Sequence, residues 1–119
     1  MSSITIELGE QAPSVNHIWK HRAIGRGVMV YVTKEGKEFK ERLGNQVPEG
    51  FNPFKGACKV TLDLTFADRR QHNIDNSNKA ILDALNNRAY VDDEQIQELL
   101  IRKHYEKGKP NIKIVVEEI

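Results

Sequence analysis

Asp75, Lys79 and Asp93 are the residues whose types and spacing could perform metal-assisted chemistry. Mg²⁺ prefers oxygen ligands and usually takes one or two carboxylates, with water and substrate phosphate completing its shell. Asp75 and Asp93 could supply those carboxylates if residues 75–88 form a helix and residues 89–92 return the chain along it. Lys79 follows Asp75 by one helical turn on the same face, where its ammonium could hold a scissile phosphate or stabilise transition-state charge.

These residues also have a purely structural interpretation. Asp75 at a helix start could cap the helix and pair with Lys79, a surface arrangement that contributes about 0.3–0.5 kcal/mol. Asp92 and Asp93 could form an ordinary acidic turn, although two adjacent carboxylates repel each other and a metal ion would stabilise them. Asp83 continues the polar stripe of Asp75 and Lys79, and we expect it to be structural or to support a ligand.

Cationic residues lie just before Asn73, and a second group of them lies nearer the N-terminus. Between positions 17 and 42 the sequence has seven Lys and Arg against three Glu, a local charge of +4, whereas the whole chain carries +1. Such a patch, with Trp19 among the cations, is typical of a surface that binds DNA phosphates and stacks on bases. A loop held by Trp19 at the edge of the core is the alternative. The predicted DNA-binding residues are Arg69, Arg70, His72, Lys20, Arg22 and Arg26.

Hydrophobic periodicity predicts the elements that must position these residues. The predicted strands are 4–8, 28–32, 57–66, 96–105 and 112–116, and the predicted helices are 34–46, with Thr33 as N-cap, and 75–88, ending at Asn86 and Asn87. One α+β domain over residues 1–119 is expected, with a mixed sheet of about four strands and two helices. The second helix is expected to cross over between the strands at 57–66 and 96–105.

The segments between these elements carry further expectations. Residues 23–27, with two glycines, predict a mobile basic loop, and residues 47–56 predict a connector. The last two strands are expected to form a hairpin with Gly108 at its tip. Tyr90 and Val91 are expected to pack, and Cys58 is expected to be a core residue rather than a nucleophile, because no activating partner is evident.

The composition is that of a protein without a membrane segment or disulfides. The chain has 119 residues, one Cys, and no long apolar run or signal-peptide pattern. One cysteine forms neither an internal disulfide nor a multi-cysteine zinc site. We therefore expect a cytoplasmic protein with no membrane partner.

Several spaced motifs together resemble the RusA family of Holliday junction resolvases. They are Asp68-Arg69-Arg70, Ile74-Asp75-Asn76, Lys79-Ala80, Asp83-Ala84-Leu85 and Asp92-Asp93-Glu94-Gln95-Ile96. The resemblance implies a small homodimeric endonuclease that uses Mg²⁺, with Mn²⁺ as a substitute, and makes paired cuts across a four-way DNA junction. It also implies metal ligands at Asn73, Asp75 and Asp93 and a catalytic lysine at Lys79.

Asn73 departs from the family pattern, which has aspartate at this position. An amide oxygen can ligate a hard cation but brings no negative charge. The site could run on two carboxylates, or Asp92, Glu94 or Asp68 could supply the third. The chain could instead be a catalytically impaired or non-catalytic junction-binding protein, and an α+β interaction module with a structural acidic cluster is a third interpretation.

Overall fold

The computed structural model describes residues 2–13, 19–24, 27–70, 72 and 77–119, and only the backbone of residues 19–24 and 27–32. Its main element is a four-stranded sheet in the order β1-β6-β4-β5. Its strands are β1 (Ser3–Leu8), β4 (Cys58–Phe66), β5 (Ile96–Tyr105) and β6 (Asn111–Glu118). β6 is antiparallel to β1 and β4, whereas β5 is parallel to β4. The predicted mixed sheet of about four strands is confirmed.

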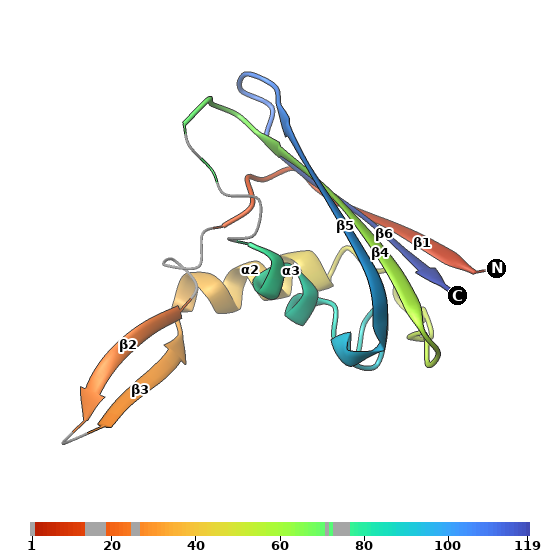
Figure 1. Cartoon of the computed structure of the whole chain (residues 1–119), viewed down its shortest axis with the longest axis horizontal. Helices are drawn as coiled ribbons and strands as arrows, with labels where there is room; N and C mark the ends of the chain where they lie inside the picture. The colour runs from red at the N-terminus through yellow and green to blue at the C-terminus, as the bar shows by residue number, and fades with distance from the viewer. Residues whose placement is uncertain (1, 14–18, 25–26, 71, 73–76) are drawn as a thin grey trace.

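The core lies between this sheet and two helices, α2 (Lys34–Gly44) and α3 (Asn78–Ala84), which cover one face of it (Figure 1). Alternate residues of β4 are buried along its whole length, as expected for a central strand. The largest fully buried side chains are Tyr90, Ile6, Leu43, Leu62, Leu64, Ile81, Leu85, Ile112, Ile114, Val60, Val116 and Cys58. Cys58 is therefore a core residue, as predicted, and burial raises the pKa of its thiol.

The ends of α2 follow from its sequence. The Thr33 hydroxyl accepts a hydrogen bond of 3.0 Å from the backbone N–H of Gly36, which confirms Thr33 as the N-cap. Phe39 and Leu43 are buried on the core side. The helix ends at Gly44, two residues before the predicted end.

A separate antiparallel hairpin precedes α2 and projects away from the main sheet (Figure 1). It consists of β2 (Trp19–Ile24) and β3 (Gly27–Val32). The predicted strand at 28–32 is confirmed, but the predicted loop over 23–27 is too long, because Ala23 and Ile24 complete β2 and Gly27 begins β3. The pairing of β2 with β3 satisfies backbone groups that a loop would leave to solvent.

The crossover from β4 to β5 contains α3, as predicted, because parallel neighbours cannot be joined by a tight turn. α3 ends at Ala84, before the predicted end at residue 88. Asn87 adopts the left-handed conformation (φ 62°), and its N–H donates to the carbonyl of Tyr90 at 2.7 Å. Tyr90 is buried as expected, but Val91 is 45% exposed, so its predicted packing is wrong. A 3₁₀ turn, η1 (Asp93–Gln95), then leads into β5.

The predicted closing hairpin is also wrong. β5 and β6 do not pair, because β4 lies between them. Gly108, with φ 70°, instead belongs to a connection that passes the end of β4, where the backbone N–H of Glu106 donates to the carbonyl of Phe66 at 3.0 Å. β6 has a continuous buried face and fits a central position, whereas most side chains of β5 are exposed and suit an edge. No helix in the described part of the chain is long and apolar enough to span a bilayer.

Candidate active site

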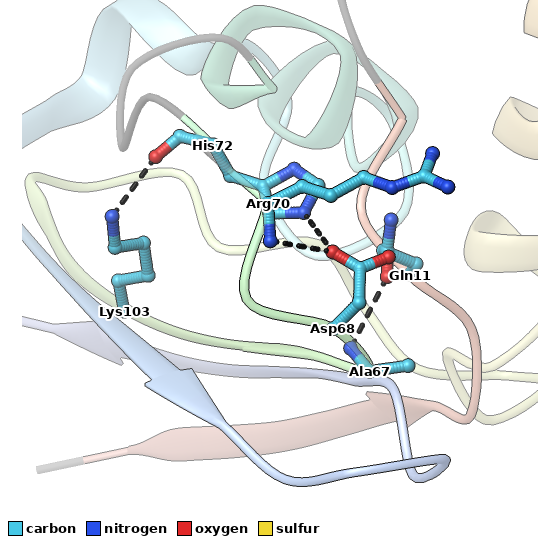
Figure 2. Close-up of polar contacts among 6 residues, drawn as sticks. All are labelled: Gln11, Ala67, Asp68, Arg70, His72 and Lys103. Carbon is cyan, nitrogen blue, oxygen red and sulfur yellow. Dashed lines mark hydrogen bonds and ion pairs between the residues drawn. The ribbon is translucent and has the colours of Figure 1, made fainter.

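The first part of the site lies where β4 and β5 end side by side, with Phe66 paired to Tyr105. The Asp68 carboxylate holds the turn that follows β4. Its Oδ1 accepts a hydrogen bond of 3.0 Å from the N–H of Arg70 and lies 2.9 Å from Nε2 of His72 (Figure 2). The contact with His72, followed by that with Arg70, holds the pKa of Asp68 below its usual range. This carboxylate is therefore ionised at neutral pH.

His72 is held on three sides. Its ring stacks on that of Phe66, with centroids 4.1 Å apart and planes at 12°. Its Nε2 contacts Asp68, and its backbone carbonyl accepts a hydrogen bond of 2.9 Å from Nζ of Lys103 on β5 (Figure 2). These contacts fix the point from which the chain continues into Asn73.

A hollow of about 190 Å³ opens beside this turn. It is lined by Phe66, Asp68, Arg69, Arg70, His72, Lys103, His104 and Tyr105. The guanidinium carbon of Arg69 lies 4.6 Å from the centroid of the Tyr105 ring, in a cation–π contact. Two arginines and a lysine against one carboxylate make the hollow cationic, and such groups are the usual protein ligands of DNA phosphates.

The second part of the site is η1, at the opposite end of β5. The backbone N–H of Asp93 donates to Oδ1 of Asn86, just after α3, at 2.9 Å. The backbone N–H of Asp92 donates to Oε1 of Gln95 at 2.9 Å, and the side-chain Nε2 of Gln95 donates to the carbonyl of Phe54 at 2.7 Å. These bonds fasten Asp93 to the C-terminal end of α3 and to the connector that precedes β4.

Negative charge is concentrated around Asp93. A side-chain hydrogen bond with Asp92, followed by burial and the charge of Asp83, raises the pKa of Asp93. Burial, with the charges of Asp93 and Asp83, also raises the pKa of the Tyr90 phenol strongly. Among the described residues, no three His, Cys, Asp or Glu side chains are arranged to hold a metal ion.

A family model described as Endodeoxyribonuclease RusA matches residues 9–117 of the 119-residue chain. The chain belongs to the RusA endodeoxyribonuclease family. The match covers both parts of the site, the turn after β4 and the turn before β5. Membership implies endonuclease activity on Holliday junctions, in DNA recombination. A search of curated proteins returned no match.

Asn73 and Asp75, two of the metal ligands that the RusA resemblance implies, lie outside the residues that the structure describes, as does the predicted DNA-binding residue Arg26. The approach of Asp75 to Asp93 therefore stays a prediction. Lys20 and Arg22 lie on β2, within the projecting hairpin, and their side chains are not described.

Lys79 lies in the first turn of α3, which comes between the two parts of the site in the sequence, and its side chain is exposed. It precedes Asp83 by one helical turn, and the charge of Asp83 acts on Asp93. α3 thus carries the predicted catalytic lysine between the segment that contains Asp75 and the turn that contains Asp93.

Several contacts of the site were not predicted from the sequence. Asn86 was predicted only to end a helix, yet its side chain anchors Asp93. Lys103 and Tyr105 belong to the first part of the site because β5 runs parallel to β4, and this register is the signal that could have located them. Asp68 and His72 bind each other, and Asp92 binds Asp93, so all four already have partners within the chain.

Proposed function

We propose that this RusA-family chain is a Mg²⁺-dependent endonuclease that resolves four-way DNA junctions by paired phosphodiester cleavage. The family match over residues 9–117 is the observation that carries the proposal. The cationic hollow after β4 supports it, because it lies immediately before the segment that contains Asn73 and Asp75. An intracellular, DNA-associated location follows from the same proposal.

The donor set fits the metal. Asp75, Asp93 and Asn73 would offer carboxylate and amide oxygens, which Mg²⁺ prefers, and Mn²⁺ accepts the same ligands. The crowding of Asp83 and Asp92 around Asp93 is an environment that a cation would stabilise. The bound ion would polarise the scissile phosphate and activate a water molecule for in-line attack.

The other residues of the site would act on the substrate. Lys79 would offset the charge that develops on the phosphate during attack. Arg69 and Arg70 would bind the DNA backbone at the hollow after β4, and Lys20, Arg22 and Arg26 would hold another part of the junction. Two copies of the chain would supply the two active sites that paired cuts require.

A non-catalytic junction-binding protein is the second candidate, and Asn73 is the observation that favours it. An amide in place of a carboxylate weakens the attraction for a divalent cation while leaving the cationic surfaces in place. Such a protein would bind junctions equally well with and without EDTA.

The Asn73→Asp variant separates the two candidates. A labelled four-way junction is incubated with the native chain or with this variant, in Mg²⁺, Mn²⁺ or EDTA, and the products are resolved on a denaturing gel. If the chain is a nuclease, Asn73→Asp should raise the cleavage rate about tenfold or more, since a charged ligand strengthens the site. If neither protein cuts branched DNA with either metal, the nuclease assignment is wrong.

A further inference from the structure

β5 is an edge strand with an apolar middle. It pairs with β4 on one side, and none of the described strands pairs with its other side. Leu99 and Leu100, at its centre, are 42% and 46% exposed. Proteins usually protect so long an edge, because its unpaired N–H and C=O groups invite another strand to add to the sheet. The edge of β5 therefore has the properties of a surface that is covered by a further strand.

We propose that a second copy of this chain covers it, through antiparallel pairing of the two β5 strands about a twofold axis at Leu100. The two four-stranded sheets would then form one continuous sheet. This inference deepens the proposed function, on which it rests for the requirement that two copies act on one junction. The surface itself is supported by the unpaired edge of β5 and by its exposed apolar residues.

The register follows from the faces of the sheet. The outer face of the sheet is the one that α2 and α3 do not cover (Figure 1). Directly opposed residues in an antiparallel pair lie on the same face of a sheet. In a continuous sheet, each outer-face residue of β5 must therefore oppose an outer-face residue of its copy. Leu100 lies on the outer face, because it pairs with Thr61 of β4, whereas Leu99 pairs with the buried Val60. The twofold axis must therefore pass through a residue rather than between two residues, and the apolar residues at the centre of β5 are Leu99, Leu100 and Ile101.

A twofold axis at Leu100 gives the register in which apolar residues oppose apolar residues and opposite charges oppose each other. It places Leu100 opposite its own copy, and Leu99 opposite Ile101. It also places Glu98 opposite Arg102, and the symmetry produces this pair of opposite charges twice. An axis at Leu99 would instead oppose Glu98 to Leu100, and an axis at Ile101 would oppose Leu100 to Arg102.

Glu98 of one copy and Arg102 of the other are each able to form this ion pair. The side chain of Glu98 is 64% exposed, and its contact with Lys59 is long, at 3.9 Å. Arg102 donates from Nε and Nη2 to the Asp63 carboxylate, at 2.7 and 3.0 Å. A guanidinium has five N–H donors, so Arg102 can bind a second carboxylate from the partner without releasing Asp63.

Cysteine cross-linking of the full chain tests the axis. Under mild oxidation, Leu100→Cys should form a disulfide-linked dimer on a non-reducing gel, because the two introduced thiols would face each other. Thr61→Cys is the matched control on the same face, one strand inward. Its two copies would be about 14 Å apart, three strand spacings, which is too far for a disulfide. Buried Cys58 remains in both variants, and the native chain gives the background.

The opposite pattern would overturn the proposal. If Thr61→Cys cross-links and Leu100→Cys does not, two copies pack through the outer faces of their sheets instead. If neither cross-links, or if the native chain sediments as a monomer, the β5 edge does not join two copies.

Charge reversal tests the register independently. Glu98→Arg and Arg102→Glu should each weaken the dimer about tenfold or more, because each places like charges opposite one another twice. The double variant restores opposite charges and should recover most of that loss in sedimentation equilibrium. If the double variant is as weak as the single variants, the register is wrong. Circular dichroism confirms that each variant is folded.

These measurements need neither DNA nor metal. A chain that dimerises through β5 but does not cut junctions would contradict the proposed nuclease and leave the interface standing. If the chain cuts junctions but Leu100→Cys forms no cross-link, the proposed nuclease stands and the β5 interface is contradicted.

Discussion

At the scale of single residues, the site depends on contacts that position the backbone as much as on the ligands themselves. Lys103 donates to the carbonyl of His72, whose ring is also held by Phe66 and Asp68. His72 is followed directly by Asn73, the first predicted ligand. An error in the direction of this backbone would displace Asn73 and Asp75 together, and catalytic rates are sensitive to such displacements.

Lys103→Met should therefore lower the rate of junction cleavage at saturating DNA about tenfold, since a hydrogen bond from a charged donor contributes about 1.5–3 kcal/mol. Lys107→Met is the matched control, because it removes the same charge from an exposed position in the connection between β5 and β6. It should leave the saturated rate near native and weaken binding only slightly. Equal losses in the two variants would show that Lys103 contributes charge rather than position.

The roles of Lys79, Asp93 and Arg69 were inferred from residue type and spacing and stay predictions. The contacts that support the site could not be predicted in this way. Asn86 and Lys103 were missed, because an asparagine that ends a helix and a lysine on an exposed strand have no distinctive local pattern. Their roles depend on which backbone group lies opposite them in the folded chain.

At the scale of elements, β4 organises the molecule. It is buried along one face, it pairs with β5 and β6, and it delivers the chain to the cationic hollow. On its outer face Asp63 accepts two hydrogen bonds from Arg102 of β5 and lies 2.8 Å from Nε2 of His104. The hydrogen bond from Arg102 is the largest of the causes that hold the pKa of Asp63 below its usual range.

This link between β4 and β5 should make stability depend on pH. A carboxyl group whose pKa is depressed by folding stabilises the fold above its unfolded pKa, and that contribution is lost as the pH falls through the folded value. Asp63→Asn should therefore lower the free energy of unfolding by about 1 kcal/mol at pH 7, and the difference should shrink below about pH 4. Urea unfolding at both pH values measures it. A difference that persists at low pH would mean that the carboxylate charge is not the cause.

Strand existence was predictable from alternation, but strand order was not. The segments at 96–105 and 111–118 are close in sequence and are separated by a glycine turn, which favours a hairpin. The structure inserts β4 between them, because β6 has a face to bury on the core and β5 leaves most of its side chains exposed. A choice between neighbouring positions in a sheet depends on contacts distant in sequence, which local periodicity does not report.

At the scale of the whole molecule, the β2–β3 hairpin is separate from the main sheet and carries the cations Lys20 and Arg22 (Figure 1). An arm of this kind can contact DNA without contributing to the core. We expect the hollow after β4 to bind the DNA strand that is cut, and the β2–β3 hairpin to bind another part of the junction.

Replacing Lys20 and Arg22 together by Ala should weaken junction binding and reduce the slope of log affinity against log salt by about 2, one unit for each lost phosphate contact. The melting temperature should stay near native, because β2 and β3 pair only with each other among the described strands. The matched control is the double replacement of Lys55 and Lys113, two exposed lysines outside residues 17–42. If that control changes the slope equally, the effect is one of general charge rather than of the hairpin.

The central claim is that Asp75 and Asp93, which are far apart in sequence, bind one metal ion. The most direct test is Mn²⁺ titration of the native chain and of Asp75→Asn and Asp93→Asn, followed by electron paramagnetic resonance, with Asp63→Asn as the control. We predict that each of the first two substitutions weakens the same site about tenfold to a hundredfold, and that the control binds like the native chain. The claim is contradicted if the native chain binds no Mn²⁺, or if either substitution leaves its affinity unchanged.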